Sequence, residues 1–213
     1  MGGMANCILC GHRKARRACP AAGGDICPQC CSEEREIKFQ CPYSCDYLCD
    51  SRIHGRVKGW PDEVAHAEVN VPLDWVRNRQ PIYLFAAGTL VMAAGPFPEV
   101  IDADVREAME TLIRNFKAAD SGLILDAAPG NPIAARIAGD FHAQRESVDK
   151  SLAESKGATL RDVDLMKTLI FLMRYLDVLN NGRPKCRAFT DTIRIDMKLP
   201  VHLAAEAKSS LIL

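Results

Sequence analysis

The sequence Cys27-Pro-Gln-Cys-Cys31 decides how the first part of this 213-residue chain must fold. Two cysteines separated by two residues form a tight turn that can direct two thiolates at one metal ion. A second pair, Cys7 and Cys10, precedes it, with sixteen residues between the two pairs. Two such pairs supply the four ligands of a tetrahedral zinc site, so the spacing predicts one Zn²⁺ bound by Cys7, Cys10, Cys27 and Cys30.

The doubled cysteine indicates a second ion. Adjacent side chains point in different directions, so Cys30 and Cys31 can face two different metals. A wider turn, Cys41-Pro-Tyr-Ser-Cys45, lies further along the chain. We expect the second ion to be bound by Cys19, Cys31, Cys41 and Cys45. Cys49 or His12 could replace one of the assigned ligands.

The position of the cysteines favours metal binding over disulfides. Nine of the ten lie between Cys7 and Cys49, and no apolar signal segment precedes them. We therefore expect a cytoplasmic protein whose thiols are kept reduced and bind metal. The spacings typical of ferredoxin clusters are missing from the sequence, which favours zinc over iron. Sites closed by four cysteines leave no position for substrate, so both zinc ions are expected to be structural.

The composition changes after this segment, which predicts two domains. Residues 1–55 are rich in cysteine, whereas residues 60–213 carry long apolar periodicities and a single cysteine, Cys186. The joint is expected at Gly55–Pro61, where glycine, proline and charge occur together. The predicted fold class is mainly α, with a small zinc-binding module followed by an all-helical domain of five or six helices.

Local signals place several helices of the second domain. Asp104-x-x-Glu107 is the pattern of a capping box that starts a helix. Pro132 is suited to the first position of another. A third is expected to end at Asn180-Asn181-Gly182, where glycine can adopt a positive φ, and a shorter one is expected at Arg187–Met197.

One stretch, Pro81–Pro98, contains no charged residue and is close to the minimum length of a membrane span. Its helical part is shorter, because Gly95-Pro96-Phe97-Pro98 breaks a helix. We therefore expect a buried core helix from Ile82 to Gly95 and no membrane contact.

The charge of the chain does not favour nucleic acid. Basic and acidic residues number 27 each, and residues 1–59 hold nine basic and six acidic side chains. Eight thiolates and two Zn²⁺ bring that segment to a charge of about −1, unlike the basic footprint of a phosphate-binding protein. The cluster Arg13-Lys14-Ala15-Arg16-Arg17 could contact phosphate, but it could also balance thiolate charge in a solvated loop.

Evidence for an enzyme is weak. Asp140, His142 and Glu146 share one expected helix, and the last two form an i,i+4 pair of a common kind. Sequence motifs of metalloproteases, hydrolases, P-loops and dinucleotide sites are missing. Asn180–Lys185 could bind an anion, although a helix C-cap explains it fully. Cys186 lies between two basic residues that could lower its pKa, but a buried or merely incidental thiol is the favoured interpretation.

Two blocks resemble uncharacterised bacterial Cys-rich proteins, in which CPxCC-x3-R and CPxxCxYL precede a helical domain. Here they are Cys27-Pro-Gln-Cys-Cys31-Ser-Glu-Glu-Arg35 and Cys41-Pro-Tyr-Ser-Cys45-Asp-Tyr-Leu48. Ser121-Gly122-Leu123 and Asn181-Gly182-Arg183-Pro184 are similar to their helical half. This resemblance covers most of the chain and implies no activity.

The order of the cysteines also resembles interleaved cross-brace fingers of the HIT-type, RING-like and B-box kinds. The chain departs from the HIT-type pattern, because Cys19 lacks a close partner and the doubled cysteine is foreign to it. The resemblance covers a quarter of the chain and implies a scaffold that binds proteins. We predict a non-enzymatic protein whose finger acts as an interaction or regulatory module. The alternatives are a nucleic-acid- or ribosome-associated zinc finger and an enzyme with its site among the helices.

Overall fold

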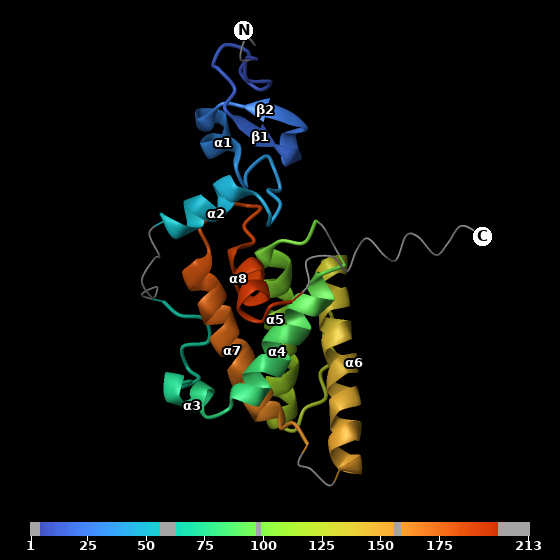
Figure 1. The fold of residues 1–213 in the computed structure, drawn as a ribbon. Helices are drawn as coiled ribbons and strands as arrows, with labels where there is room; N and C mark the ends of the chain where they lie inside the picture. Colours follow the sequence, from blue (N-terminus) through green and yellow to red (C-terminus); the bar gives the residue numbers. More distant parts are fainter. Residues whose placement is uncertain (1–4, 56–62, 97–98, 156–158, 200–213) are drawn as a thin grey trace, which may run out of the picture. The chain divides into compact units, whose positions relative to one another are not determined.

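The computed structural model describes residues 5–55, 63–96, 99–155 and 159–199 (Figure 1). In these ranges the chain forms eight α-helices and one two-stranded sheet, which confirms the expected mainly α fold. It divides into two compact units. The finger unit is Met1–Val57 with Asn181–Cys186, and the helical unit is Lys58–Asn180 with Arg187–Leu213. The expected joint lies outside the described residues except for its first residue, Gly55.

The finger unit has short elements and a small core. Its elements are β1 (Arg17–Cys19), the 3-10 helix η1 (Pro20–Ala22), β2 (Gly24–Ile26), α1 (Pro28–Glu34) and α2 (Asp46–Ile53). The two strands pair antiparallel, with Arg17 opposite Ile26. Gly23 has a φ of 69°, in the left-handed region that favours glycine, and this allows the tight connection between them. One buried cluster of this unit consists of four cysteines and a single aliphatic residue, Ile26.

The helical unit is a bundle of four long helices with two shorter ones. Its elements are α3 (Leu73–Arg77), α4 (Gln80–Ala94), α5 (Asp102–Asp120), α6 (Pro132–Glu154), α7 (Asp162–Leu179) and α8 (Ala188–Asp196). α4 and α5 each pack against both α6 and α7, and α8 packs against α4 and α7 (Figure 1). The core between them is aliphatic and aromatic, and Phe141 and Phe189 are fully buried in it. The six helices formed by the described residues of this unit agree with the expected five or six.

The uncharged stretch forms α4, as expected for a core helix. Ala86, Leu90 and Ala94 are fully buried along it. Among the described residues, no helix combines the length and the apolar character that a membrane crossing requires. Phe97 and Pro98, which belong to the expected helix-breaking end, lie outside the described residues.

The start of α5 corrects one prediction. Asp104 was expected to precede the helix as its cap, but α5 begins at Asp102 and contains Asp104. The Asp104 carboxylate instead accepts a hydrogen bond from the backbone N–H of Ile101 at 2.9 Å. Asp104 therefore caps the residue before the helix from a position within the first turn. Two other signals are confirmed, because Pro132 is the first residue of α6 and Gly182 has a φ of 79°.

A buried carboxylate connects α5 to α8. Asp102 accepts hydrogen bonds from the N–H of Phe189 at 2.9 Å and from the N–H and hydroxyl of Thr190 at 3.0 and 2.7 Å. These N–H groups belong to the first turn of α8 and have no partner inside that helix. Burial raises the pKa of Asp102 to about 6, although the hydrogen bonds from Thr190 and Phe189 act in the opposite direction.

Candidate metal centre

The structure brings together the four cysteines of the first predicted site. The sulfur atoms of Cys7, Cys10, Cys27 and Cys30 all lie within 4.8 Å of one another. Four thiolates around a tetrahedral Zn²⁺ at 2.3 Å from each would be about 3.8 Å apart. The group therefore fits a single ion after a small contraction. Cys7 and Cys27 are 1% exposed, so this cluster could hold a metal ion largely shielded from water.

Tight turns place both pairs of sulfur atoms. In the first, the N–H of Gly11 donates to the carbonyl of Cys7 at 2.8 Å, and Gly11 has a φ of 71°. In the second, Cys27 is the N-cap of α1, and its Sγ accepts the N–H of Cys30 at 3.4 Å. Pro28 occupies the first helical position, where the lack of an N–H costs nothing. The Cys-Pro-x-Cys sequence thus forms the first turn of α1.

The electrostatics of the cluster favour a cation. Burial alone would raise the pKa of Cys7, but backbone N–H groups of Cys10, Cys27 and Leu9 lower it to about 6. The hydrogen bond between Cys30 and Cys27, together with burial, raises the pKa of Cys30 to about 12. Ionisation of one thiol in this cluster thus makes ionisation of its neighbours less favourable. A divalent cation would allow all four to ionise, because metal binding releases thiol protons.

The second predicted set is arranged more loosely. Among the described residues, Cys19, Cys31, Cys41 and Cys45 do not form a group as tight as the first. Burial raises the pKa of Cys41; the charges of Cys45, Glu36 and Cys19 add to this effect, whereas the hydrogen bond from the backbone N–H of Glu36 opposes it.

Cys31, on α1, is not one of the four cysteines grouped in the first site, and the Arg35 guanidinium lies 3.5 Å from its sulfur. Burial would raise the pKa of Cys31, but Arg35 and Arg17 outweigh it and lower that pKa.

The two spare ligands have contacts of their own. The thiol of Cys49 donates to the carbonyl of Tyr43 at 3.5 Å. His12 is exposed, and its Nδ1 lies 2.7 Å from the carbonyl oxygen of Cys10. Their places in a second site therefore remain predictions, as does that site itself.

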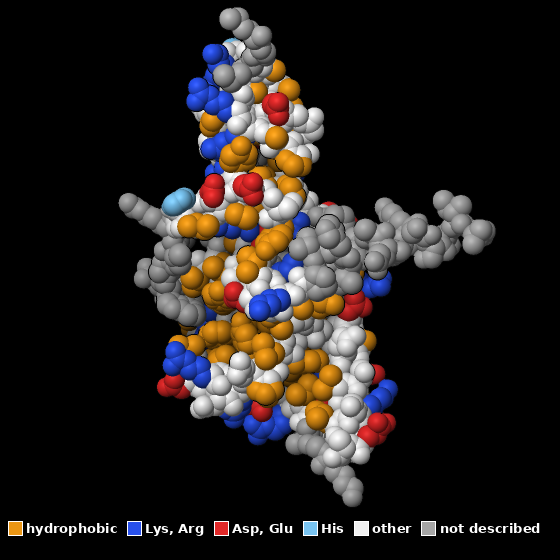
Figure 2. Space-filling view, viewed as in Figure 1, with side chains coloured by type: hydrophobic (Ala, Val, Ile, Leu, Met, Phe, Trp, Pro, Cys, Tyr) orange, Lys and Arg blue, Asp and Glu red, His pale blue; other side chains and the backbone are white. Residues whose placement is uncertain are grey.

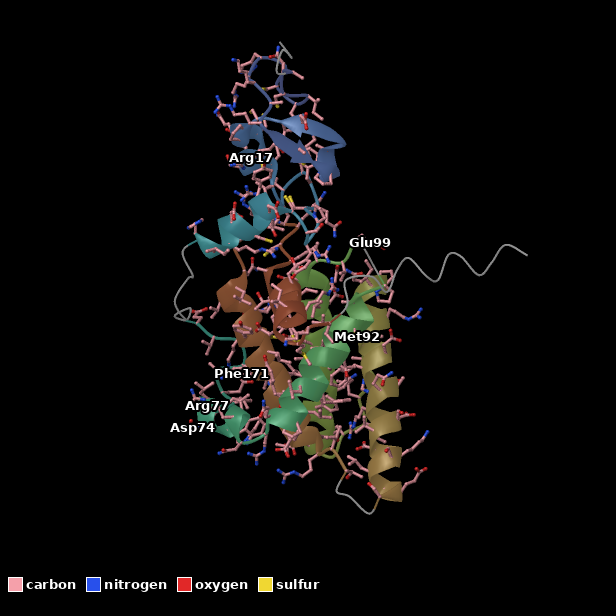
Figure 3. The ribbon with its side chains drawn as sticks, in the orientation of Figure 1. Arg17, Asp74, Arg77, Met92, Glu99 and Phe171 are labelled. Atoms are coloured by element: carbon pink, nitrogen blue, oxygen red, sulfur yellow. The ribbon has the colours of Figure 1, made fainter. Side chains whose placement is uncertain are left out.

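Two of the four side chains in the basic cluster contact the finger itself. The guanidinium of Arg13 lies 3.8 Å from the sulfur of Cys27. That of Arg17, labelled in Figure 3, stacks over the ring of Tyr47 at 4.5 Å and donates to Cys31. Lys14 and Arg16 are exposed, and basic side chains line one edge of this unit in Figure 2. The arginines thus partly neutralise thiolates, as one of the two sequence interpretations proposed.

Glu36, a buried acid that follows α1, is not among the residues predicted from the sequence. It is 2% exposed and has a φ of 53°, which is unusual for a residue with a side chain. Its carboxylate accepts hydrogen bonds from Arg52 at 2.9 Å and from Asn181 at 2.7 Å. The sequence around it, Ser32-Glu-Glu-Arg-Glu-Ile-Lys38, is typical of an exposed surface, and no local signal distinguishes this glutamate.

The candidate catalytic side chains do not converge. Asp140 and Met92 line an open groove of about 590 Å³ between α4 and α6. Met92 is labelled on α4 in Figure 3. His142 instead packs its ring against Phe116, with the ring centroids 6.2 Å apart. Burial lowers the pKa of His142, and Arg145 adds to this effect. Apolar side chains make up most of the lining of the groove.

Arg183 and Lys185, from the stretch that could bind an anion, also have defined partners. They donate to backbone carbonyls of the finger unit rather than facing an anion site.

The metal cluster is therefore the strongest candidate site in the described residues. Comparisons of the chain with protein-family models, with curated proteins and with solved structures found no match.

Proposed function

We propose that this is a non-enzymatic zinc protein whose finger unit binds a protein partner in the cytoplasm, in an interaction or regulatory role. The observation that carries the proposal is the closed group formed by Cys7, Cys10, Cys27 and Cys30. Four thiolates saturate a tetrahedral ion and leave no position for substrate. Such an ion stabilises a fold whose cysteine core contains one large aliphatic side chain.

The proposal includes zinc as the metal and a second ion bound by Cys19, Cys31, Cys41 and Cys45. All-cysteine ligands in paired turns suit Zn²⁺. The influence of the Cys45 and Cys19 charges on the Cys41 thiol supports the second site. Metal binding would draw these four thiolates together, as in small domains that complete their fold only with zinc.

The contacts of the basic cluster favour a protein partner over nucleic acid, because part of the cluster is already engaged within the finger. Arg13 and Arg17 are engaged with Cys27, Cys31 and Tyr47, which leaves only part of the cluster for phosphate. Phosphate binding usually relies on many free Lys and Arg side chains. A nucleic-acid or ribosomal role is the second candidate, supported by the exposed Lys14 and Arg16.

Affinity purification of the tagged full chain from its native cells tests this proposal. We expect a protein partner that resists nuclease treatment and disappears from the Cys27→Ser/Cys30→Ser variant. A Cys49→Ser variant serves as the matched control and should retain the partner. Circular dichroism at 222 nm should show that the helical unit stays folded in both variants.

Recovery only of nuclease-sensitive material would contradict the proposal. The nucleic-acid alternative further predicts that retention falls steeply with salt and that Arg13→Ala/Arg16→Ala/Arg17→Ala abolishes it.

A further inference from the structure

The segment Asn181–Cys186 belongs to the finger unit, although more than 120 residues separate it from α2. Its first contact is with the buried Glu36, whose carboxylate accepts the side-chain amide of Asn181 at 2.7 Å. The same carboxylate pairs with Arg52 at 2.9 Å. The finger therefore contains a buried carboxylate that binds both α2 and the distant segment Asn181–Cys186.

Two basic residues of the segment bind backbone carbonyls. The Arg183 guanidinium donates to the carbonyls of Arg35 and Ser32, the second at 3.0 Å. Carbonyls at a helix C-terminus lack partners inside the helix, so Arg183 caps α1. The Lys185 backbone N–H donates to the Glu36 carbonyl at 2.8 Å, and its ammonium group donates to the Lys38 carbonyl at 2.6 Å.

These acceptors form a surface that we call the acceptor face. It comprises the carbonyl oxygens of Ser32, Arg35, Glu36 and Lys38 and the carboxylate of Glu36. Each contact named above between the segment and the rest of the finger has its donor in the segment and its acceptor in the finger. The segment has neither helix nor strand, and Pro184 favours an extended backbone before it. A face of this kind is complementary to an extended basic peptide.

We propose that the acceptor face is a peptide-binding site that Asn181–Cys186 fills in cis. Its partner in trans would be a protein segment with the same donors, an asparagine amide, an arginine two residues later and a lysine two residues after that. This inference rests on the proposed function, since it specifies the partner of the finger. The tethered segment has a high effective concentration, so a partner must displace it.

The test uses the full chain and a fluorescein-labelled peptide with the sequence of residues 179–187, carrying serine in place of its cysteine. Fluorescence anisotropy measures its binding to the wild type and to Arg183→Ala/Lys185→Ala, which weakens the cis contact. We expect at least tenfold tighter binding to the variant. Adding Glu36→Gln should weaken that binding again by at least tenfold, and a peptide with alanine at the position of Arg183 should not bind.

A matched control, Arg136→Ala/Lys150→Ala, removes two charges from exposed side chains of α6 and should behave as the wild type. Equal binding to the wild type and to Arg183→Ala/Lys185→Ala would overturn the inference, and so would no binding to a variant that retains its zinc. If Arg183→Ala/Lys185→Ala loses zinc, hydrogen exchange of the wild type tests whether the peptide displaces the segment. Excess peptide should then accelerate exchange at the Lys185 amide of the wild type, and unchanged exchange would overturn the inference.

The result is independent of the purification experiment. A nuclease-resistant partner without peptide binding would refute the acceptor face as its site and leave the proposed function intact. Peptide binding without any metal-dependent partner would refute the proposed function while the acceptor face stands.

Discussion

Replacing Glu36 with alanine tests how the finger unit holds Asn181–Cys186. The Glu36 side chain is 3% exposed and its partner Arg52 is 22% exposed, so water screens this ion pair only partly. Hydrogen bonds to charged groups contribute about 1.5–3 kcal/mol each. Taking the lower value for each of the two bonds, from Arg52 and Asn181, we expect Glu36→Ala to destabilise the finger unit by about 3 kcal/mol.

Of the two bonds that Glu36→Ala removes, only that of Asn181 holds the segment, so local release of the segment becomes easier by about 1.5 kcal/mol. This corresponds to roughly tenfold faster hydrogen exchange at the Lys185 amide, since 1.4 kcal/mol is a factor of ten. Nuclear magnetic resonance of the zinc-loaded full chain measures this rate. Glu36→Gly should be less destabilising than Glu36→Ala by about 1 kcal/mol, because glycine accepts the φ of 53° without strain.

Glu33→Ala is the control for this experiment. Glu33 is an exposed acid in α1 whose carboxylate pairs with Gln29 at 2.8 Å. Its removal changes the net charge by the same amount but touches no group of the segment. Exchange at Lys185 that stays within twofold of the wild type in Glu36→Ala, or that rises equally in Glu33→Ala, would refute the reasoning.

Three further predictions concern the metal cluster and the helical core. Cys30→Ser should lower the bound zinc by one ion in elemental analysis, whereas Cys49→Ser should leave it unchanged; equal losses would count against the assignment. Ile26→Ala, at a side chain 1% exposed, should destabilise the finger by about 2–4 kcal/mol and accelerate zinc transfer to a chelator, and an unchanged rate would argue against its core role. Burial raises the pKa of Asp102 to about 6, so the folded helical unit keeps a proton between pH 4 and 6 that the unfolded chain releases. Its stability should fall by about 3 kcal/mol as pH rises through this window. Asp102→Asn should flatten that slope in urea denaturation followed at 222 nm, and parallel profiles would contradict this.

Local signals predicted much of the helical unit, because they depend on neighbours in sequence. Apolar periodicity located α5, α6 and α7, and Pro132 marked the first residue of α6. The start of α5 was misplaced because Asp104 can act either before a helix or within its first turn. Only the hydrogen bond to Ile101 distinguishes these two cases.

The cysteine pairs were predictable for the same reason. Each two-residue spacing closes one tight turn, and the turns at Cys7 and Cys27 direct their sulfurs into one group. The burial of Glu36 could not be predicted, since its partners Arg52 and Asn181 come from distant parts of the chain. Such contacts leave no periodicity or spacing in the sequence. Contacts of this kind, between residues distant in sequence, also join Asn181–Cys186 to the rest of the finger.

Zinc K-edge X-ray absorption of the full chain, purified without added metal, tests the central claim most directly. If Cys7, Cys10, Cys27 and Cys30 hold a closed structural site, the chain contains zinc and its ligand shell consists of sulfur at about 2.3 Å. A chain that purifies without metal, or a shell that contains oxygen or nitrogen, would contradict the account of this finger.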